Sequence, residues 1–269
     1  MHGVTQPCPE PAPPSLTMPH PAAPPIGLVL PTSSPPPISL ADGVGLVWQD
    51  THLGVVIKPS GLLSVPGRGP DKQDCLSTRL AAAGMPSLVV HRLDQATSGL
   101  MLFARSAQMQ RQLSHAFAQR QVHKQYVACV HGRLRMTDDW QMIDAPIAAD
   151  WPRRPLRIVA ETGQGSQTLW RCLGHPTLTG TAPAEGSYVA LRPLSGRTHQ
   201  LRVHMQHIGH PILGDALYAP PELQTQSHGL MLHAQQLGLT HPLTGEKLVF
   251  ENNPAWLPSA WGTLLNALS

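Results

Sequence analysis

Short apolar runs separated by polar turns predict strands in the first half of the chain. Residues 46–48 and 55–57 form two such runs with polar residues between them, which predicts a hairpin. A second pair of runs, residues 88–90 and 99–104, flanks a tight polar turn that contains Asp94. A turn of this kind between two buried strands presents a polar side chain for chemistry.

Three segments have the spacing of amphipathic helices. A short helix is expected to begin at Asp74 or Ser77 and to run to Ala83, with Gly84 as its stop. A second, of about 13 residues, is expected to follow Ser106 as its N-cap. A third is expected from Thr198 to Gly209. The apolar faces of the second and third helices are formed by Met109, Leu113 and Phe117 and by Leu201, Met205 and Ile208.

The second half of the chain is predicted to form mainly further strands. Residues 124–130 alternate so that Lys124 and Tyr126 share one face. Weak strand signals lie near positions 143, 158 and 169, and clearer ones at residues 188–192, 232–234 and 248–250.

The first 44 residues differ in amino-acid composition from the rest of the chain. Residues 1–40 hold 13 of the 29 prolines and one charged side chain, Glu10. Proline lacks a backbone donor and fixes φ, so this composition favours an extended, solvated tail rather than a packed unit. A proline-rich ligand for a partner domain is the alternative. We therefore expect a disordered tail at 1–44 and one catalytic domain at 45–269.

The charged residues and the cysteines indicate which kinds of partner and location suit the protein. Only four of the 19 cationic residues are lysines, so arginine dominates, which suits phosphate contacts but also follows from a GC-rich genome. The four cysteines form no C-x-x-C pair, and no apolar run has the length of a membrane span. A reducing, cytoplasmic location is expected.

Asp94 is the strongest candidate for chemistry. A carboxylate can act as a nucleophile or base when a cation keeps it ionised, and Arg92 and Arg202 are the candidate cations. Taken alone, an aspartate in a turn beside an arginine is more often a capping or salt-bridged structural residue than a catalytic one. Arg202 lies off the apolar face of its helix, so its removal is expected to leave folding intact.

The sequence contains none of the motifs that mark zinc proteases, serine hydrolases or nucleotide-binding folds. No H-E-x-x-H, G-x-S-x-G, G-x-x-x-x-G-K or G-x-G-x-x-G pattern is present. A metal site among four closely spaced histidines is disfavoured by their spacing, since they do not share one helix face: His199, His204, His207 and His210. What remains is one acid, one strand tyrosine and dispersed arginines, which suits a polyanion whose reactive part is a planar base.

Four motifs, in order, carry a resemblance to the RluA-type pseudouridine synthases. The central one is His91-Arg-Leu-Asp-Gln-Ala-Thr-Ser-Gly-Leu, which is similar to the family's catalytic H-R-L-D-x-x-T-S-G motif. Three other segments match further family motifs: residues 58–66, residues 124–126, and residues 195–204 with 209–215. The loops at 65–68 and 150–155 resemble those of the subgroup that acts on both 23S rRNA and tRNA. Because residues 1–45 are too rich in proline for an S4 domain, none is expected before the catalytic domain, which agrees with this subgroup.

The resemblance implies an α+β fold, in which a bent, mixed and mostly antiparallel sheet with flanking helices holds a central RNA-binding cleft. It implies conversion of uridine to pseudouridine in hairpin loops of 23S rRNA or the tRNA anticodon stem-loop, by base flipping, without metal or cofactor. RNA is the expected partner of a monomeric protein. A catalytically idle RNA-binding or ribosome-assembly factor is the alternative.

Roles for individual residues follow from the same resemblance. Asp94 would be the nucleophile, Tyr126 would pack on the base and assist proton removal at C5, and Arg202 would pair with Asp94. Arg92 would fill space near the vacated stack. The full set of expected substrate-binding residues is Arg92, His91, Thr97, Lys58, Arg197, His199, Arg153 and Arg154.

Overall fold

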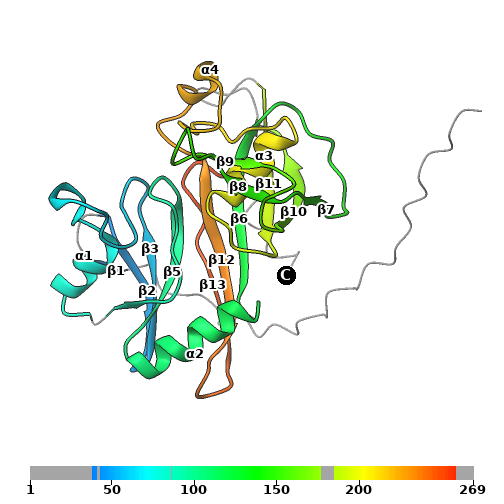
Figure 1. Cartoon of the computed structure of the whole chain (residues 1–269). Helices are drawn as coiled ribbons and strands as arrows, with labels where there is room; N and C mark the ends of the chain where they lie inside the picture. Colours follow the sequence, from blue (N-terminus) through cyan, green and yellow to red (C-terminus); the bar gives the residue numbers. More distant parts are fainter. Residues whose placement is uncertain (1–37, 41–42, 86, 177–184, 259–269) are drawn as a thin grey trace, which may run out of the picture.

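A computed structural model describes residues 38–40, 43–85, 87–176 and 185–258. These residues form one sheet of eleven strands and a separate two-stranded hairpin (Figure 1). The sheet runs in the order β1-β2-β3-β5-β12-β6-β11-β10-β7, with β4 beside β5 and β13 beside β12. Its strands are β1 (Ile38–Ser39), β2 (Gly45–Gln49), β3 (Leu53–Lys58), β4 (Leu88–Val89), β5 (Ser98–Ala104), β6 (His123–His131), β7 (Gln141–Asp144), β10 (Gln167–Gly174), β11 (Gly186–Pro193), β12 (Leu232–Thr240) and β13 (Lys247–Glu251).

One parallel contact joins the two halves of this sheet. All pairs of neighbouring strands are antiparallel except β5 and β12, where Gly99 lies opposite Ala234. Gly99 has a φ of 118°, and a Cβ there would lie 2.4 Å from the Ala234 carbonyl oxygen. The close approach therefore requires glycine. The expected mixed, mostly antiparallel α+β fold is confirmed.

The helices pack on the sheet largely where the sequence predicts them. Helix α2 (Ala107–Ala118) covers β5, and the Ser106 hydroxyl accepts a hydrogen bond from the Met109 backbone N–H at 3.2 Å, as expected for its N-cap. Met109 and Leu113 are buried against the core. Helices α1 (Leu76–Ala82), α3 (Gln200–His207) and α4 (Pro221–Gln224) and the 3-10 turn η1 (Pro70–Lys72) complete the set in the described residues.

Two predicted caps differ from the structure. Helix α1 starts after Cys75, whose backbone N–H donates to the Thr78 hydroxyl, because Asp74 is engaged with Arg79 instead. Helix α3 starts after His199 rather than Thr198. The local side-chain contacts thus decide the first turn where several residues could act as a cap.

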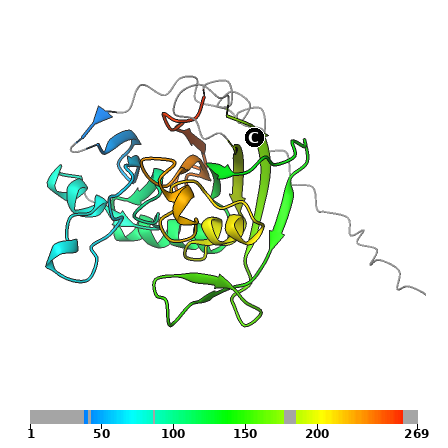
Figure 2. The same ribbon diagram turned by 90° about the horizontal axis from the view of Figure 1, so that it is seen from above.

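The weak strand signals of the middle segment are confirmed. They correspond to β7, β10 and the hairpin of β8 (Ile147–Ala149) and β9 (Arg157–Val159), and this hairpin stands away from the body of the molecule in Figure 2. The sheet begins with β1, before the expected boundary at residue 45. Residues 1–37 of the expected tail, and 177–184 of the segment between β10 and β11, lie outside the described residues.

None of the helices in the described ranges combines the length and the apolar character of a membrane span.

A buried histidine beside the parallel contact predicts a pH-dependent stability. His233 on β12 receives a hydrogen bond from Ser98 at Nδ1 and donates from Nε2 to the Asn252 carbonyl. Burial lowers the pKa of His233 from 6.5 to about 4. The unfolded chain therefore binds a proton first, so the stability that this group contributes is complete above pH 6.5 and is lost as the pH falls toward 4.

We expect His233→Gln to reduce the slope of unfolding free energy against pH between 6.5 and 5 by about 1 kcal/mol per pH unit, because the unfolded chain binds somewhat less than one extra proton over this range. Urea denaturation at each pH measures this slope. His228→Gln, at an exposed position, should keep the wild-type slope. An unchanged slope in His233→Gln would show that His233 does not titrate on unfolding.

Candidate active site

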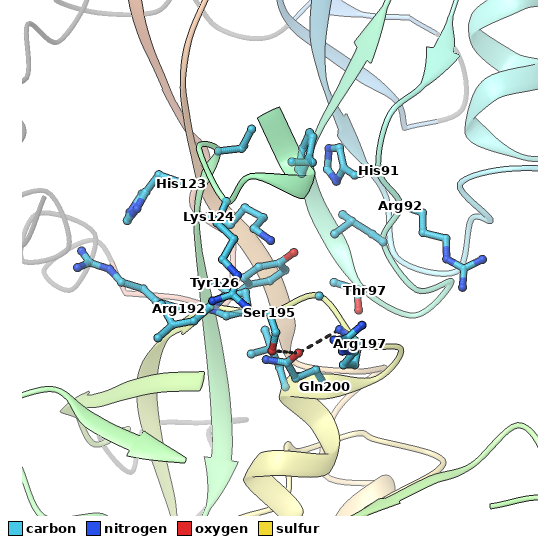
Figure 3. A pocket seen from close by; sticks show the side chains of 18 of the residues that line it. His91, Arg92, Thr97, His123, Lys124, Tyr126, Arg192, Ser195, Arg197 and Gln200 are labelled. Atoms are coloured by element: carbon cyan, nitrogen blue, oxygen red, sulfur yellow. Dashed lines mark hydrogen bonds between the residues drawn. The ribbon is translucent and has the colours of Figure 1, made fainter. Parts of the chain in front are cut away.

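A cleft of about 880 Å³ lies where the two halves of the sheet meet. It is lined by the polar turn before β5, the end of α2 with the start of β6, the end of β11 and the start of α3. In Figure 3, Tyr126 from β6 lies on one side of the view and His91, Arg92 and Thr97 of the turn lie on the other, together with Arg197 near α3. The cleft is therefore lined by side chains that are more than one hundred residues apart in the sequence.

The turn that carries Asp94 is held from behind by the loop after β3. The Ser64 hydroxyl donates to the Leu93 carbonyl at 2.7 Å and accepts from the Leu93 N–H at 3.1 Å. On the other side of Asp94, the Gln95 carbonyl accepts from the Gly61 N–H at 2.9 Å. Asp94 is thus fixed by backbone contacts on both sides, while its own side chain is 26% exposed in the cleft.

Lys58 belongs to this support and not to the cleft lining. Its fully buried ammonium group donates to the carbonyls of Pro59, Leu62 and Gln95, at 2.8, 2.7 and 3.2 Å. An ammonium has three hydrogens, so its donor capacity is used. Burial lowers the pKa of Lys58 to about 8, and the charge of Asp94 opposes this shift. The expected contact of Lys58 with substrate is corrected to a positioning role.

Arg202 has two carboxylate neighbours at different distances. Its Nε and Nη2 donate to the two oxygens of Asp215 at 2.8 and 2.6 Å, in a forked pair. Its Nη1 lies 3.6 Å from the Asp94 Oδ2 atom. Arg202 therefore faces Asp94, as the sequence predicts, but its hydrogen-bonded partner is Asp215.

The Arg202–Asp215 pair is buried, with side-chain exposures of 4% and 0%. Burial tends to lower the pKa of Arg202, but the hydrogen bond and charge of Asp215 outweigh this and raise it. The guanidinium is permanently charged. Removing it would leave Asp215 as an uncompensated buried charge, so the expectation that Arg202 can be removed without loss of folding does not hold.

Tyr126 and Lys124 line the cleft from β6, as their shared strand face predicts. Burial and then the charge of Asp94 raise the pKa of Tyr126, which keeps the phenol protonated at neutral pH. Burial lowers the pKa of Lys124. A neutral ring of this kind suits packing on a base better than action as a phenolate.

His91 and Thr97 line the cleft but are tied into the protein. The His91 Nε2 accepts from the Leu102 N–H at 2.9 Å, and the ring stacks on Phe117 at 4.6 Å. Burial, with the charge of Lys124, lowers the pKa of His91 to about 3, so the ring is neutral. Thr97 is buried, whereas Arg92 is exposed at the cleft edge. Of the three, Arg92 is the one placed to meet a large substrate.

Arg197 and His199 come from the turn before α3. This turn is anchored by Gln200, whose side-chain oxygen accepts from the Ser195 hydroxyl and the Arg197 N–H at 2.8 and 3.0 Å (Figure 3). His199 Nε2 lies 3.9 Å from the Asp94 Oδ2 atom. The turn thus brings one exposed cation and one imidazole to the cleft.

Arg153 and Arg154 do not line this cleft. They lie at the end of the β8–β9 hairpin, where Arg153 pairs with Asp150 at 2.6 Å and the Arg154 guanidinium lies 3.5 Å from the centre of the Trp151 ring. Trp151 is 68% exposed. Any contact of these arginines with a substrate would extend beyond the cleft.

Sequence reasoning assigned no role to several residues that shape the site. Asp215, Tyr218 and Arg192 are the most important of them. One signal was available: Asp215 is a lone acid between the apolar residues 211–213 and 217–219, and such an acid needs a buried partner. Within the described residues, no group of His, Cys, Asp and Glu side chains is arranged to hold a metal ion.

Comparison with known proteins points to one family. A family model described as RNA pseudouridylate synthase matches residues 52–207. The chain is 44% identical over 207 residues to the dual-specificity RNA pseudouridine synthase RluA of Yersinia pestis, in an alignment that covers 77% of this chain and 97% of the relative. The protein of the same name from Escherichia coli K12 is 42% identical, with coverages of 77% and 91%.

Solved structures agree with these relatives. Human RNA Pseudouridylate Synthase Domain Containing 1 superimposes with a TM-score of 0.69 at 26% identity, and covers 86% of this chain and 96% of its own. Human RNA Pseudouridylate Synthase Domain Containing 4 gives a TM-score of 0.61 at 26% identity, with coverages of 83% and 92%.

The buried pair predicts a large loss of stability in Asp215→Asn. The substitution keeps the shape of the side chain but leaves the buried Arg202 guanidinium without its counter-charge, which should reduce the free energy of unfolding by about 3 kcal/mol or more. Urea denaturation measures this loss.

Asp74→Asn is the matched control, because Asp74 also forms a forked pair with an arginine, Arg79, but at the surface. Only a small loss is expected there, since water screens an exposed pair. Equal losses in the two variants would contradict the structural importance of the Arg202–Asp215 pair.

Proposed function

The chain belongs to the RNA pseudouridylate synthase family and is an RNA uridine isomerase; from this premise we propose that Asp94 is its nucleophile. The observation that carries the proposal is the position of Asp94. It is a partly exposed carboxylate on a rigid turn, 3.6 Å from the buried cation Arg202 and facing the same cleft as Tyr126. No other aspartate or glutamate is among the residues that line the cleft.

The reaction requires the N1–C1′ bond of uridine to break and a C5–C1′ bond to form, while C5 loses its proton and N1 gains one. In the proposed path, the Asp94 carboxylate forms a bond to C1′ as the N1–C1′ bond breaks, and this C1′–O bond breaks in turn when C5 bonds to C1′, which restores the free carboxylate. Arg202 balances the charge of Asp94 from behind. Tyr126 packs on the uracil while the base rotates, after the N1–C1′ bond breaks and before the C5–C1′ bond forms. Its raised pKa supports packing as the main role, and assistance with the C5 proton as a lesser one.

The target base must leave its stack to reach Asp94. Extrusion of a nucleotide has a free-energy cost of a few kcal/mol, which is smallest in a loop, so hairpin loops are the proposed substrates. Arg92 lies exposed at the cleft edge, where it can occupy the space near the vacated stack. Arg197 and Lys124 supply further positive charge for the phosphates around the extruded nucleotide.

The proposed substrates are 23S rRNA and the anticodon stem-loop of tRNA. The support is the likeness to RluA proteins that are named as dual-specificity enzymes. A monomer is proposed because Asp94, Tyr126 and Arg202, the proposed catalytic set, already meet in one cleft within a single chain. A cytoplasmic location belongs to the same proposal, since rRNA and tRNA lie there. The comparisons give no support for the alternative of an idle RNA-binding factor.

The β8–β9 hairpin is proposed as a second contact for the RNA. Its base packs on α3 next to the cleft, and its end carries an exposed tryptophan stacked by Arg154. An arginine on an aromatic face beside a second arginine suits a phosphate backbone next to an unpaired base. The hairpin would then bind the part of the stem-loop that extends beyond the cleft.

Release of tritium from RNA labelled at uridine C5 tests the nucleophile. Wild type should release tritium from a stem-loop substrate, and Asp94→Asn should release none above background, because a carboxamide cannot act as a nucleophile. Asp139→Asn, at an exposed position outside the cleft, should retain the wild-type rate. Undiminished release by Asp94→Asn would reject the assignment.

The double substitution of Arg153 and Arg154 by alanine tests the hairpin contact. KM for the stem-loop should rise about fivefold with kcat unchanged, and the slope of log affinity against log salt should fall by about 1 to 2, because each phosphate contact contributes about 0.9. Fluorescence anisotropy at several salt concentrations measures the slope.

Arg133 and Arg135 are the matched pair for the control. Both are exposed and follow the far end of β6 from the cleft, so their replacement by alanine should change neither quantity. Equal effects of the two double variants would mean that the hairpin contributes only general positive charge.

A further inference from the structure

The hydroxyl of Tyr218 links the β8–β9 hairpin to the cleft. Tyr218 is buried behind His199 and is not part of the cleft lining. Its oxygen lies 3.0 Å from the Arg157 backbone nitrogen and 2.6 Å from the His199 Nδ1 atom. Two short hydrogen bonds therefore meet at one phenolic oxygen.

The hydrogen-bond donors around Tyr218 follow from the groups on either side of His199. A backbone N–H only donates, so the Tyr218 oxygen accepts from Arg157. On the far side of the ring, the Asp94 carboxylate only accepts, so we assign the ring hydrogen to the Nε2 atom that faces it, and Nδ1 then accepts from the Tyr218 hydroxyl. A neutral imidazole carries one hydrogen, so in His199 that hydrogen lies on Nε2.

The Nε2 atom of His199 faces the catalytic carboxylate. It lies 3.9 Å from the Asp94 Oδ2 atom, which is the same oxygen that Arg202 approaches at 3.6 Å. Both distances exceed a hydrogen bond, and contacts between catalytic groups are often long before substrate binds. His199 and Arg202 thus approach the same carboxylate oxygen from two different residues of one helical segment.

The surroundings favour a neutral ring. His199 is 10% exposed, and burial lowers its pKa, while the charges of Asp94 and Asp215 oppose the shift and those of Arg202 and Arg157 add to it. Two carboxylates and two guanidinium groups thus face the imidazole. Burial outweighs the attraction of the two carboxylates, so His199 is available as a neutral donor.

The backbone of His199 is also unusual. As the residue before α3 it has φ 58° and ψ 16°, in the left-handed region that side-chain-bearing residues seldom adopt. Such a conformation persists only where the surroundings impose it. Here the contact with Tyr218 and the anchoring of the turn by Gln200 provide the constraint.

We propose that His199 is a positioning residue for the reaction, whose Nε2–H, oriented by Tyr218, joins Arg202 in holding the Asp94 carboxylate toward the ribose. The proposal rests on the proposed role of Asp94. Tyr218 acts only through His199, and the same hydroxyl joins the RNA-contacting hairpin to this arrangement through the Arg157 N–H.

Nuclear magnetic resonance of the ring nitrogens tests the arrangement without reference to turnover. In protein labelled with ¹⁵N-histidine, the signals of His199 are identified by their loss in His199→Gln. At pH 7.5, His199 should show the Nε2–H tautomer, and Tyr218→Phe should convert it to a mixture of tautomers. The Nδ1–H tautomer or a charged ring in wild type, or no change in Tyr218→Phe, would overturn the proposal.

Single-turnover kinetics test the effect on the reaction. Tyr218→Phe should lower the rate about tenfold with KM for the stem-loop within twofold. Tyr188→Phe is the matched control, because Tyr188 is a buried core tyrosine outside the cleft. It should leave the rate unchanged. A Tyr218→Phe variant with normal rate, or one that raises only KM, would contradict a positioning role.

A second pair of variants separates positioning from folding. His199→Gln keeps an N–H donor at this position and should retain more of the rate than His199→Leu, at equal thermal stability. Equal rates in the two variants would mean that the N–H donor of His199 does not matter and that the residue has only a structural role. If instead Asp94→Asn were active, the proposed nucleophile would fail, while the tautomer of His199 would still report on the hydrogen-bond chain itself.

Discussion

The site depends on one buried ion pair between Arg202 and Asp215. A guanidinium and a carboxylate that leave water must satisfy each other, and here they do so through two short hydrogen bonds. Asp215 also accepts the N–H groups of Leu217 and Tyr218, so the same carboxylate shapes the turn that carries Tyr218. The remaining edge of Arg202 faces Asp94. Folding itself therefore places a fixed positive charge behind the Asp94 carboxylate.

The cleft exists because two halves of the sheet meet at one parallel contact. Asp94 comes from the turn before β5, in one half, whereas Arg202 and Tyr126 come from α3 and β6, in the other. The glycine at position 99 allows β5 and β12 to approach closely enough to join them. Lys58 and Ser64 then hold the turn from behind. A rigid acid and its cation thus meet only in the assembled domain.

Much of this could be predicted from local pattern. The N-cap at Ser106, the shared face of Lys124 and Tyr126, and the approach of Arg202 to Asp94 all follow from periodicity or from motif resemblance. The role of Lys58 could not be predicted, because a lysine is expected at the surface unless its buried partners are known. For Asp215 the flanking apolar residues signal a buried partner, but they do not identify that partner as Arg202. The parallel pairing of β5 and β12 joins segments too distant for any local signal.

The central claim is that Asp94 acts on a uridine extruded into the cleft and packed on Tyr126. The most direct test is a crystal structure of Asp94→Asn with a uridine-containing stem-loop, in which the distance from the target C1′ atom to residue 94 is measured. We predict an unstacked uracil on the Tyr126 ring, with its ribose in van der Waals contact with the residue 94 side chain. A target uridine that stays stacked in the RNA, or a ribose held away from residue 94, would contradict the account.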